Sequence, residues 1–267
     1  MLMPANWRQY NIEFPDPRTA DVAAAQHLRP ALVAAQNDGT LRGWWFVRKQ
    51  PWKLRYQADP HTDTPLDELL DALTGDYVTS WTMGVYEPET LAFGGEDGMH
   101  VAHELFHADS YHLLIRAPGR DTPTALGSRE TAVVLCGAML RAAGLDWFEQ
   151  GDVWAKVAAL RPTQQPPPGK ITLVAKMQRL MTTDTRTLCD PRRGGPLVGL
   201  DIWVAAFEQA GQELFHLARH GRLQRGLRAV LAHHVIFHAN RAGLSVPDLS
   251  TLAALALNTV FAPPDTP

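Results

Sequence analysis

Alternating apolar and polar residues predict strands in the first third of the chain. Residues 7–14 (WRQYNIEF) alternate and are rich in aromatic side chains, as an opening strand would be. Residues 41–49 (LRGWWFVRK) form an apolar run typical of a buried strand, which Pro51 ends. The alternation resumes in residues 52–57 (WKLRYQ), and residues 76–86 (DYVTSWTMGVY) are also strand-like.

Apolar residues at helical spacing dominate the remainder. An Ala-rich stretch over residues 19–36 predicts a helix that Pro30 kinks or divides. Further helices are expected at residues 64–73, 98–116, 128–143, 147–160, 171–183, 200–220, 223–242 and 247–261, and loops at residues 118–124, 162–169 and 190–196. Strands followed by helices indicate the α+β class. We expect a small mixed or antiparallel sheet from the N-terminal third, packed with a largely helical C-terminal two-thirds, in one domain over residues 1–267.

Composition and charge exclude several classes of protein. The chain is 45% hydrophobic and 20% charged, as globular proteins are, and no apolar run has the ~18–20 residues that span a membrane. The N-terminal residues lack a signal-peptide pattern. Cys136 and Cys189 are the only cysteines, so no disulfide framework is expected. The net charge of −3 argues against nucleic-acid binding. We therefore expect a cytoplasmic protein without membrane or nucleic-acid partners.

Two groups of charged residues could bind a substrate. Lys53 and Arg55 lie on one face of the strand at residues 52–57. Neighbouring cations repel each other unless an anion lies between them, so this face is either solvated or binds an anionic group. Glu87 and Glu89 stand at a strand-to-helix junction. They are either part of a polar turn, or bases or anchors for a cationic group.

The helix at residues 98–116 carries His100, His103 and His107 on one face. Zinc could use such a face, and residues 103–107 (HELFH) have the order HExxH found in zinc proteases. We nevertheless expect no metal, and histidines that pack or face the substrate.

The late helix at residues 223–242 combines cations and histidines. Arg222, Arg225 and Arg228 recur every three residues and predict a basic stripe, which is either solvated or faces an anion. His238 follows in apolar surroundings. A buried histidine usually only satisfies a hydrogen bond, but near carboxylates and cations its pKa can suit acid–base catalysis.

Three segments together resemble one family. They are WWFVRKQPWKLRY, YEPETLAFGGEDGMHVAHELFHADS and RGLRAVLAHHVIFHANRAGL. They are similar to the stand-alone thiopeptide-type bacteriocin biosynthesis proteins, relatives of the glutamate-elimination domain at the C-terminus of class I lanthipeptide dehydratases. The resemblance extends from Trp7 to about Phe261 and implies that fold.

The resemblance implies two activities. One expels glutamate from a glutamylated Ser or Thr of a ribosomal precursor peptide. The other joins two dehydroalanines in a formal [4+2] cycloaddition and, with loss of water and the leader peptide, forms the pyridine of a thiopeptide macrocycle. Neither activity implies a metal or an organic cofactor. The implied partners are a precursor peptide, with its leader and modified core, and a dehydratase.

The functional residues of the family's elimination domains can be matched to positions of this chain. The two basic strand residues of those domains match Lys53 and Arg55, their carboxylate matches Glu89, and their catalytic histidine matches His238. Their arginine two residues before the Gly-Gly is replaced by Ala92. Losing a preorganised cation harms elimination more than a cycloaddition, in which positioning dominates.

The resemblance therefore favours a thiopeptide pyridine synthase. The alternatives are a split dehydratase subunit that eliminates glutamate, and a non-catalytic scaffold that binds the precursor peptide. The scaffold would be favoured if His238 were sequestered. The expected catalytic residues are His238 as acid/base, Glu89 as its orienting or anchoring carboxylate, and Arg55 as the polarising cation. The expected substrate-binding residues are Lys53, Tyr86, Glu87, Arg222, Arg225, Arg228 and Asn240, of which the three arginines would contact an acidic leader.

Overall fold

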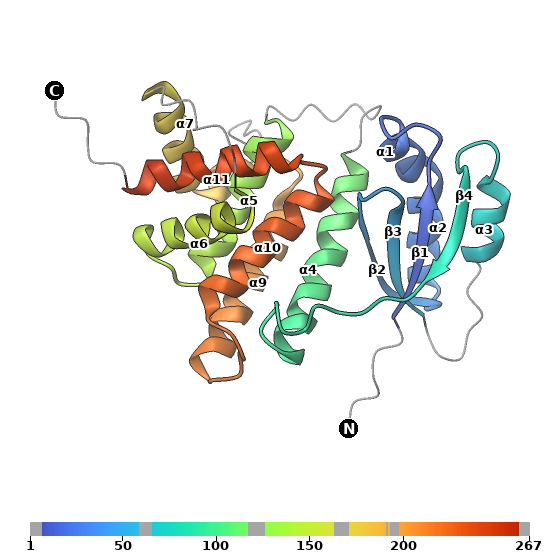
Figure 1. The fold of residues 1–267 in the computed structure, drawn as a ribbon, viewed down its shortest axis with the longest axis horizontal. Helices are drawn as coiled ribbons and strands as arrows, with labels where there is room; N and C mark the ends of the chain where they lie inside the picture. Colours follow the sequence, from blue (N-terminus) through green and yellow to red (C-terminus); the bar gives the residue numbers. More distant parts are fainter. Residues whose placement is uncertain are drawn as a thin grey trace. The chain divides into compact units, whose positions relative to one another are not determined.

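The computed structural model describes residues 7–58, 66–116, 126–162, 171–190, 192 and 198–261. Contacts divide the chain into two compact units (Figure 1): unit 1 contains Met1–Pro88 and Phe106–Thr122, and unit 2 contains Glu89–Leu105 and Pro123–Pro267. The single domain expected over residues 1–267 stays a prediction. Most of the loops predicted at residues 118–124, 162–169 and 190–196 lie outside the described residues.

Unit 1 contains a four-stranded antiparallel sheet in the order β2-β3-β1-β4. Its strands are β1 (Trp7–Glu13), β2 (Leu41–Val47), β3 (Trp52–Ala58) and β4 (Ser80–Gly84). The alternation in β3 determines two different faces. Leu54 and Tyr56 are buried in the core, whereas Lys53 and Arg55 lie on the opposite, partly exposed face. The prediction that these two cations share a face is confirmed.

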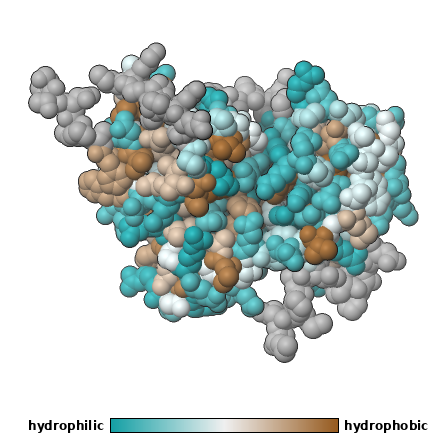
Figure 2. Space-filling view, in the orientation of Figure 1, coloured by the Kyte–Doolittle hydropathy of each residue, from teal (hydrophilic) through white to brown (hydrophobic). Residues whose placement is uncertain are grey.

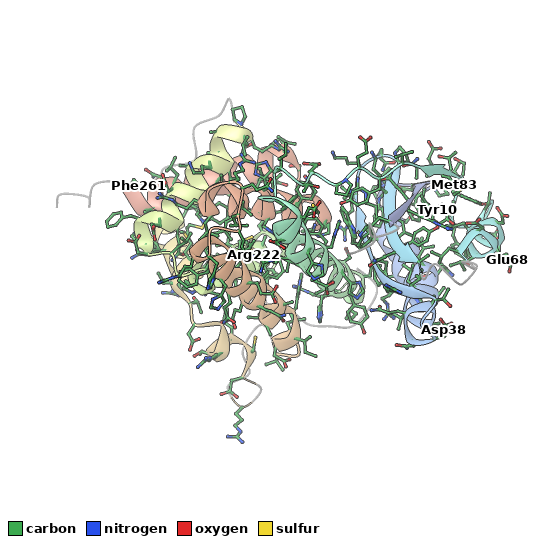
Figure 3. The ribbon with its side chains drawn as sticks, turned by 90° about the horizontal axis from the view of Figure 1, so that it is seen from below. Tyr10, Asp38, Glu68, Met83, Arg222 and Phe261 are labelled. Carbon is green, nitrogen blue, oxygen red and sulfur yellow. The ribbon has the colours of Figure 1, made fainter. Side chains whose placement is uncertain are left out.

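The helices of unit 1 pack on the buried face of the sheet. They are α1 (Ala20–Ala23), the π-helical turn η1 (Ala24–Leu28), α2 (Arg29–Asn37) and α3 (Leu66–Leu73). Pro30 lies in the first turn of α2, and the N–H of Arg29 bonds to the carbonyl of Ala24, five residues back. The division expected at Pro30 is therefore confirmed. The wider π-helical turn η1, just before Pro30, separates α1 from α2. In the core, Tyr10 (Figure 3) stacks on Tyr56 with ring centres 5.2 Å apart.

Unit 2 is helical in its described part. Its helices are α5 (Ser128–Ala142), α6 (Trp147–Leu160), α7 (Ile171–Thr182), α8 (Thr185–Cys189), α9 (Asp201–Arg219), α10 (Leu227–Arg241) and α11 (Val246–Phe261). Helix α4 (Glu96–Ile115) belongs to unit 2 up to Leu105 and to unit 1 from Phe106. Helix α10 packs on α5, α6 and α9. The α+β class is confirmed; the short helix α8 was not predicted.

The described surface mixes polar and apolar residues (Figure 2). The exposed apolar side chains include Met83 on β4 in unit 1, and Phe148 and Phe261 in unit 2, whose rings lie 6.1 Å apart. Within the residues that the structure describes, no helix is both long and apolar enough to cross a lipid bilayer.

Candidate functional site

Arg55 on β3 is held by three side chains of unit 1. Its guanidinium carbon lies 4.4 Å from the centre of the Trp45 ring and 4.3 Å from that of the Tyr86 ring. Its Nε donates a 2.8 Å hydrogen bond to Oε1 of Gln9, whose side chain is 5% exposed. Aromatic faces attract a cation at these distances. The charge of Arg55 is therefore positioned by the fold itself, as electrostatic stabilisation of a reacting group requires.

Strand register explains this arrangement. Arg55 is paired with Trp45 of β2 on one side and with Gln9 of β1 on the other, so all three side chains share one face of the sheet. Tyr86 follows β4, the neighbour of β1. The sequence did not indicate that Gln9 and Trp45 belong to this group. Alternation within each strand was visible, but the register between strands was not.

The other predicted site residues of unit 1 are partly or fully exposed. Lys53 is partly exposed and is paired with Asn11 of β1 and Val47 of β2. Glu87 is exposed and Tyr86 is partly buried. Their roles in binding a substrate stay predictions.

Glu89 opens a turn of unit 2 that leads into helix α4. Its carbonyl accepts hydrogen bonds from the N–H groups of Ala92, at 2.9 Å, and Phe93, at 3.2 Å. Gly94 and Gly95 then adopt positive φ angles of 86° and 102°, which L side chains adopt only with strain. The side chain of Glu89 is exposed, so its carboxylate can meet a ligand.

The fully buried ring of Phe93 attaches this turn to helix α10. Its centre lies 6.2 Å from that of His233, 4.9 Å from that of His234 and 5.0 Å from that of Phe237. The carbonyl of Gly94 also accepts a 2.8 Å hydrogen bond from the N–H of Gln224, just before α10. The position of Glu89 in unit 2 is therefore set by apolar packing of its own turn.

The predicted basic stripe along a helix is wrong. Helix α9 ends at Arg219 and α10 begins only at Leu227, so Arg222 and Arg225 lie in the connection. Gly221, with φ of 67°, ends α9, and the N–H of Arg222 bonds to the carbonyl of Leu217 at 2.9 Å. The helix stop at Gly221 was predicted, but the helix was expected to resume four residues too early, at residue 223 instead of 227.

Two of these three arginines are paired with carboxylates. Arg222 (Figure 3) lies 2.7 Å from Asp97, and Arg228 lies 2.8 Å from Asp152. All of these side chains are substantially exposed, so each pair contributes little to stability. Contact of the three arginines with a leader peptide stays a prediction, although these arginines do not form the helical stripe that suggested it.

Arg225 instead reaches the turn that carries Glu89. Its Nη1 donates a 3.3 Å hydrogen bond to the carbonyl oxygen of Ala92. The resemblance implied a missing arginine at Ala92. A guanidinium from a distant part of the sequence therefore lies beside that position.

His238 on α10 is buried. It is 1% exposed, and its ring lies 5.1 Å from that of Phe207 and 6.3 Å from that of Trp203, both on α9. Asn240, two residues later, is partly exposed. A general acid or base must come within hydrogen-bond reach of the substrate. His238 therefore has the sequestered position expected for the scaffold alternative, and its catalytic role stays a prediction.

His234, one turn earlier, is also 1% exposed. Its burial, with further contributions from Arg241 and His233, lowers the pKa of its imidazole from 6.5 to about 3. His234 is therefore neutral at physiological pH.

His107 of helix α4 has a structural role in unit 1. Its Nδ1 donates a 2.8 Å hydrogen bond to the carbonyl of Trp44, and its Nε2 lies 3.1 Å from Nε2 of Gln36. Ser110, one turn further along, accepts a 3.2 Å hydrogen bond from the N–H of Phe46. Helix α4 thus covers the outer edge of β2, which would otherwise offer its backbone to another strand.

The other two histidines predicted on this face, His100 and His103, lie in unit 2, where His100 is exposed and His103 is partly exposed. In the described ranges, no cluster of three or more His, Cys, Asp or Glu side chains could hold a metal ion.

Comparison with known proteins identifies relatives of this fold. A family model described as "Lantibiotic biosynthesis dehydratase C-term" matches residues 7–260. The tRNA-dependent lantibiotic dehydratase MibB from Microbispora sp. 107891 is similar in structure, with a TM-score of 0.61 and 18% identity. The match covers 97% of this chain and 28% of MibB, so the chain spans little more than a quarter of that protein.

Two further solved structures match over nearly their whole length. TsrL has a TM-score of 0.57 and 14% identity, and the match covers 95% of this chain and 94% of TsrL. TbtD, described as the pyridine synthase from thiomuracin biosynthesis, has a TM-score of 0.57 and 14% identity, with 95% of this chain and 97% of TbtD covered. At these identities the likeness shows the fold alone.

No curated protein matches the sequence. The family match, by contrast, includes both units and every site residue discussed above. The chain therefore belongs to the family of lantibiotic dehydratase C-terminal domains, whose members modify ribosomally made peptides.

Proposed function

We propose that this chain is a thiopeptide pyridine synthase. It would join two dehydroalanines of a precursor peptide by [4+2] cycloaddition, with loss of water and the leader peptide. The observation that carries the proposal is the match to TbtD, a pyridine synthase, which covers 97% of that protein. The fold that accompanies pyridine formation in TbtD is thus almost entirely contained in this chain.

The charged side chains suit the chemistry of cycloaddition. That reaction needs an amide in its iminol form and two alkenes held in register, so fixed polar groups matter more than a strong nucleophile. Arg55, clamped by Trp45, Tyr86 and Gln9, can polarise an amide carbonyl of the substrate. The exposed carboxylate of Glu89 can accept a hydrogen bond from a peptide N–H group.

Glutamate elimination is the second candidate. The missing arginine at Ala92 was the reason to disfavour it, and the contact between Arg225 and the Ala92 carbonyl weakens that reason. A peptide-binding scaffold is the third candidate, and the burial of His238 favours it.

One pair of substrates separates the three functions. The protein is incubated with a linear precursor that contains dehydroalanines and azoles, and separately with a glutamylated linear peptide, and masses are followed. We expect release of the leader with macrocycle formation from the first peptide and no change in the second. Loss of glutamate from the second would instead establish elimination. Binding without any change in mass would establish the scaffold.

A matched pair of variants tests the role of Arg55. Arg55→Gln removes the clamped cation and should lower turnover by about 10²-fold or more. Lys49→Gln removes an exposed cation of the same unit and should leave turnover unchanged. Equal effects of the two substitutions would show that Arg55 has no specific role.

The partners follow from the same proposal. They are a ribosomal precursor peptide, with its leader and modified core, and a dehydratase that installs the dehydroalanines. Copurification of a tagged precursor with this chain, and its loss when the leader is deleted, would test the first of them.

A further inference from the structure

The histidines of helix α10 differ in exposure. His234 and His238 are each 1% exposed, whereas His233 is partly exposed. A histidine exchanges a proton with a substrate only within hydrogen-bond distance of the reacting atoms. Of these three side chains, His233 alone is accessible to a substrate in the structure.

A hydrogen bond to the backbone sets the tautomer of His233. Its Nδ1 lies 3.0 Å from the carbonyl oxygen of Ala229, one turn earlier in α10. A carbonyl oxygen can only accept, so in the neutral ring Nδ1 carries the hydrogen and Nε2 carries the lone pair. The same bond orients the ring, so His233 offers a positioned base at Nε2.

The ring of Phe93 connects His233 with the turn that carries Glu89. The two ring centres are 6.2 Å apart in an edge-on contact, and the N–H of Phe93 bonds to the Glu89 carbonyl at 3.2 Å. Arg225 binds the Ala92 carbonyl of the same turn at 3.3 Å. The base His233 on α10, the exposed carboxylate of Glu89 in the turn that packs on α10, and the exposed guanidinium of Arg225 just before α10 therefore belong to neighbouring segments of unit 2.

We propose that His233 is the histidine of this chain that exchanges protons with the precursor peptide, an inference that rests on the proposed function. Nε2 of His233 takes the proton from the nitrogen of the reacting amide. The imidazolium then returns that proton to the oxygen of the same amide. The amide becomes its iminol form and His233 ends neutral, so no proton is gained or lost.

Turnover of matched histidine variants tests this role. His233→Gln should lower turnover of the dehydroalanine-containing precursor by about 10²–10⁴-fold, without changing peptide affinity in an anisotropy assay. Added imidazole should restore part of the turnover of His233→Ala, which a merely structural residue would not allow. The control is His220→Gln, because His220 makes the same kind of bond, from Nδ1 to the His216 carbonyl, at the exposed end of α9. Wild-type turnover in His233→Gln overturns the proposal.

A chemical-modification experiment tests the same site without turnover. Diethyl pyrocarbonate should modify His233 faster than His234 or His238, and bound precursor peptide should protect it. If the peptide binds and His233 is still modified at an undiminished rate, or if the peptide does not bind, the inference is refuted. Protection of His233 by a peptide that the wild-type protein does not change in mass would overturn the proposed function but support this site.

Discussion

Replacing His234 by leucine should remove part of the acid sensitivity of unit 2. The pKa of His234 is lowered from 6.5 to about 3 in the folded protein, chiefly by burial and further by Arg241 and His233. Between these two values the unfolded chain binds a proton at this position and the folded chain does not. The free energy of unfolding therefore falls as pH drops below about 6.5, and this loss levels off near the folded-state pKa.

The magnitude follows from the same two pKa values. At about pH 5, protonation of an unfolded-state histidine with pKa 6.5 stabilises the unfolded chain by about 2 kcal/mol. At about pH 8 that contribution is close to zero. The wild-type protein should lose this amount between the two conditions through His234 alone, because the folded-state pKa lies well below both of them.

Urea unfolding followed by far-ultraviolet circular dichroism measures the effect, since most described helices belong to unit 2. The difference in unfolding free energy between wild type and His234→Leu should change by about 2 kcal/mol between pH 8 and pH 5, in favour of the variant at the lower pH. The same replacement at exposed His220 shows what removal of a surface imidazole contributes. If both variants alter the pH dependence equally, burial of His234 is not its cause.

Two further substitutions test the contacts within each unit by urea unfolding. Gln9→Leu removes the acceptor of the Arg55 Nε–H and should lower the free energy of unfolding by about 1–3 kcal/mol. Gln57→Leu, at a partly exposed position of the same face, should lower it much less, and an equal loss would contradict the role of Gln9. Asp146→Ala removes the capping box at the start of α6, in which Asp146 accepts a 2.8 Å hydrogen bond from the N–H of Glu149, and should cost about 1 kcal/mol. An unchanged midpoint for that variant would show that the cap does not stabilise α6.

The sequence alone determined most of the elements and the class of fold. Alternation separates Lys53 and Arg55 from the core face of β3, and Pro30 and Gly221 mark where helices are divided or end. These signals are local, because they depend on the period of a strand or helix and on the backbone limits of proline and glycine. The three long segments that resemble one family led to that family, which the match over residues 7–260 confirms.

Only the tertiary structure decided which of these residues are available for chemistry. Arg55 meets Trp45 and Gln9 through strand register, and Arg225 meets Ala92 across more than a hundred positions of sequence. Neither pairing has a periodicity that could be read along the chain. Burial by neighbouring helices also decided which histidines of α10 a substrate could reach. Adjacent positions of a helix point in different directions, so a neighbouring helix covers only some of them.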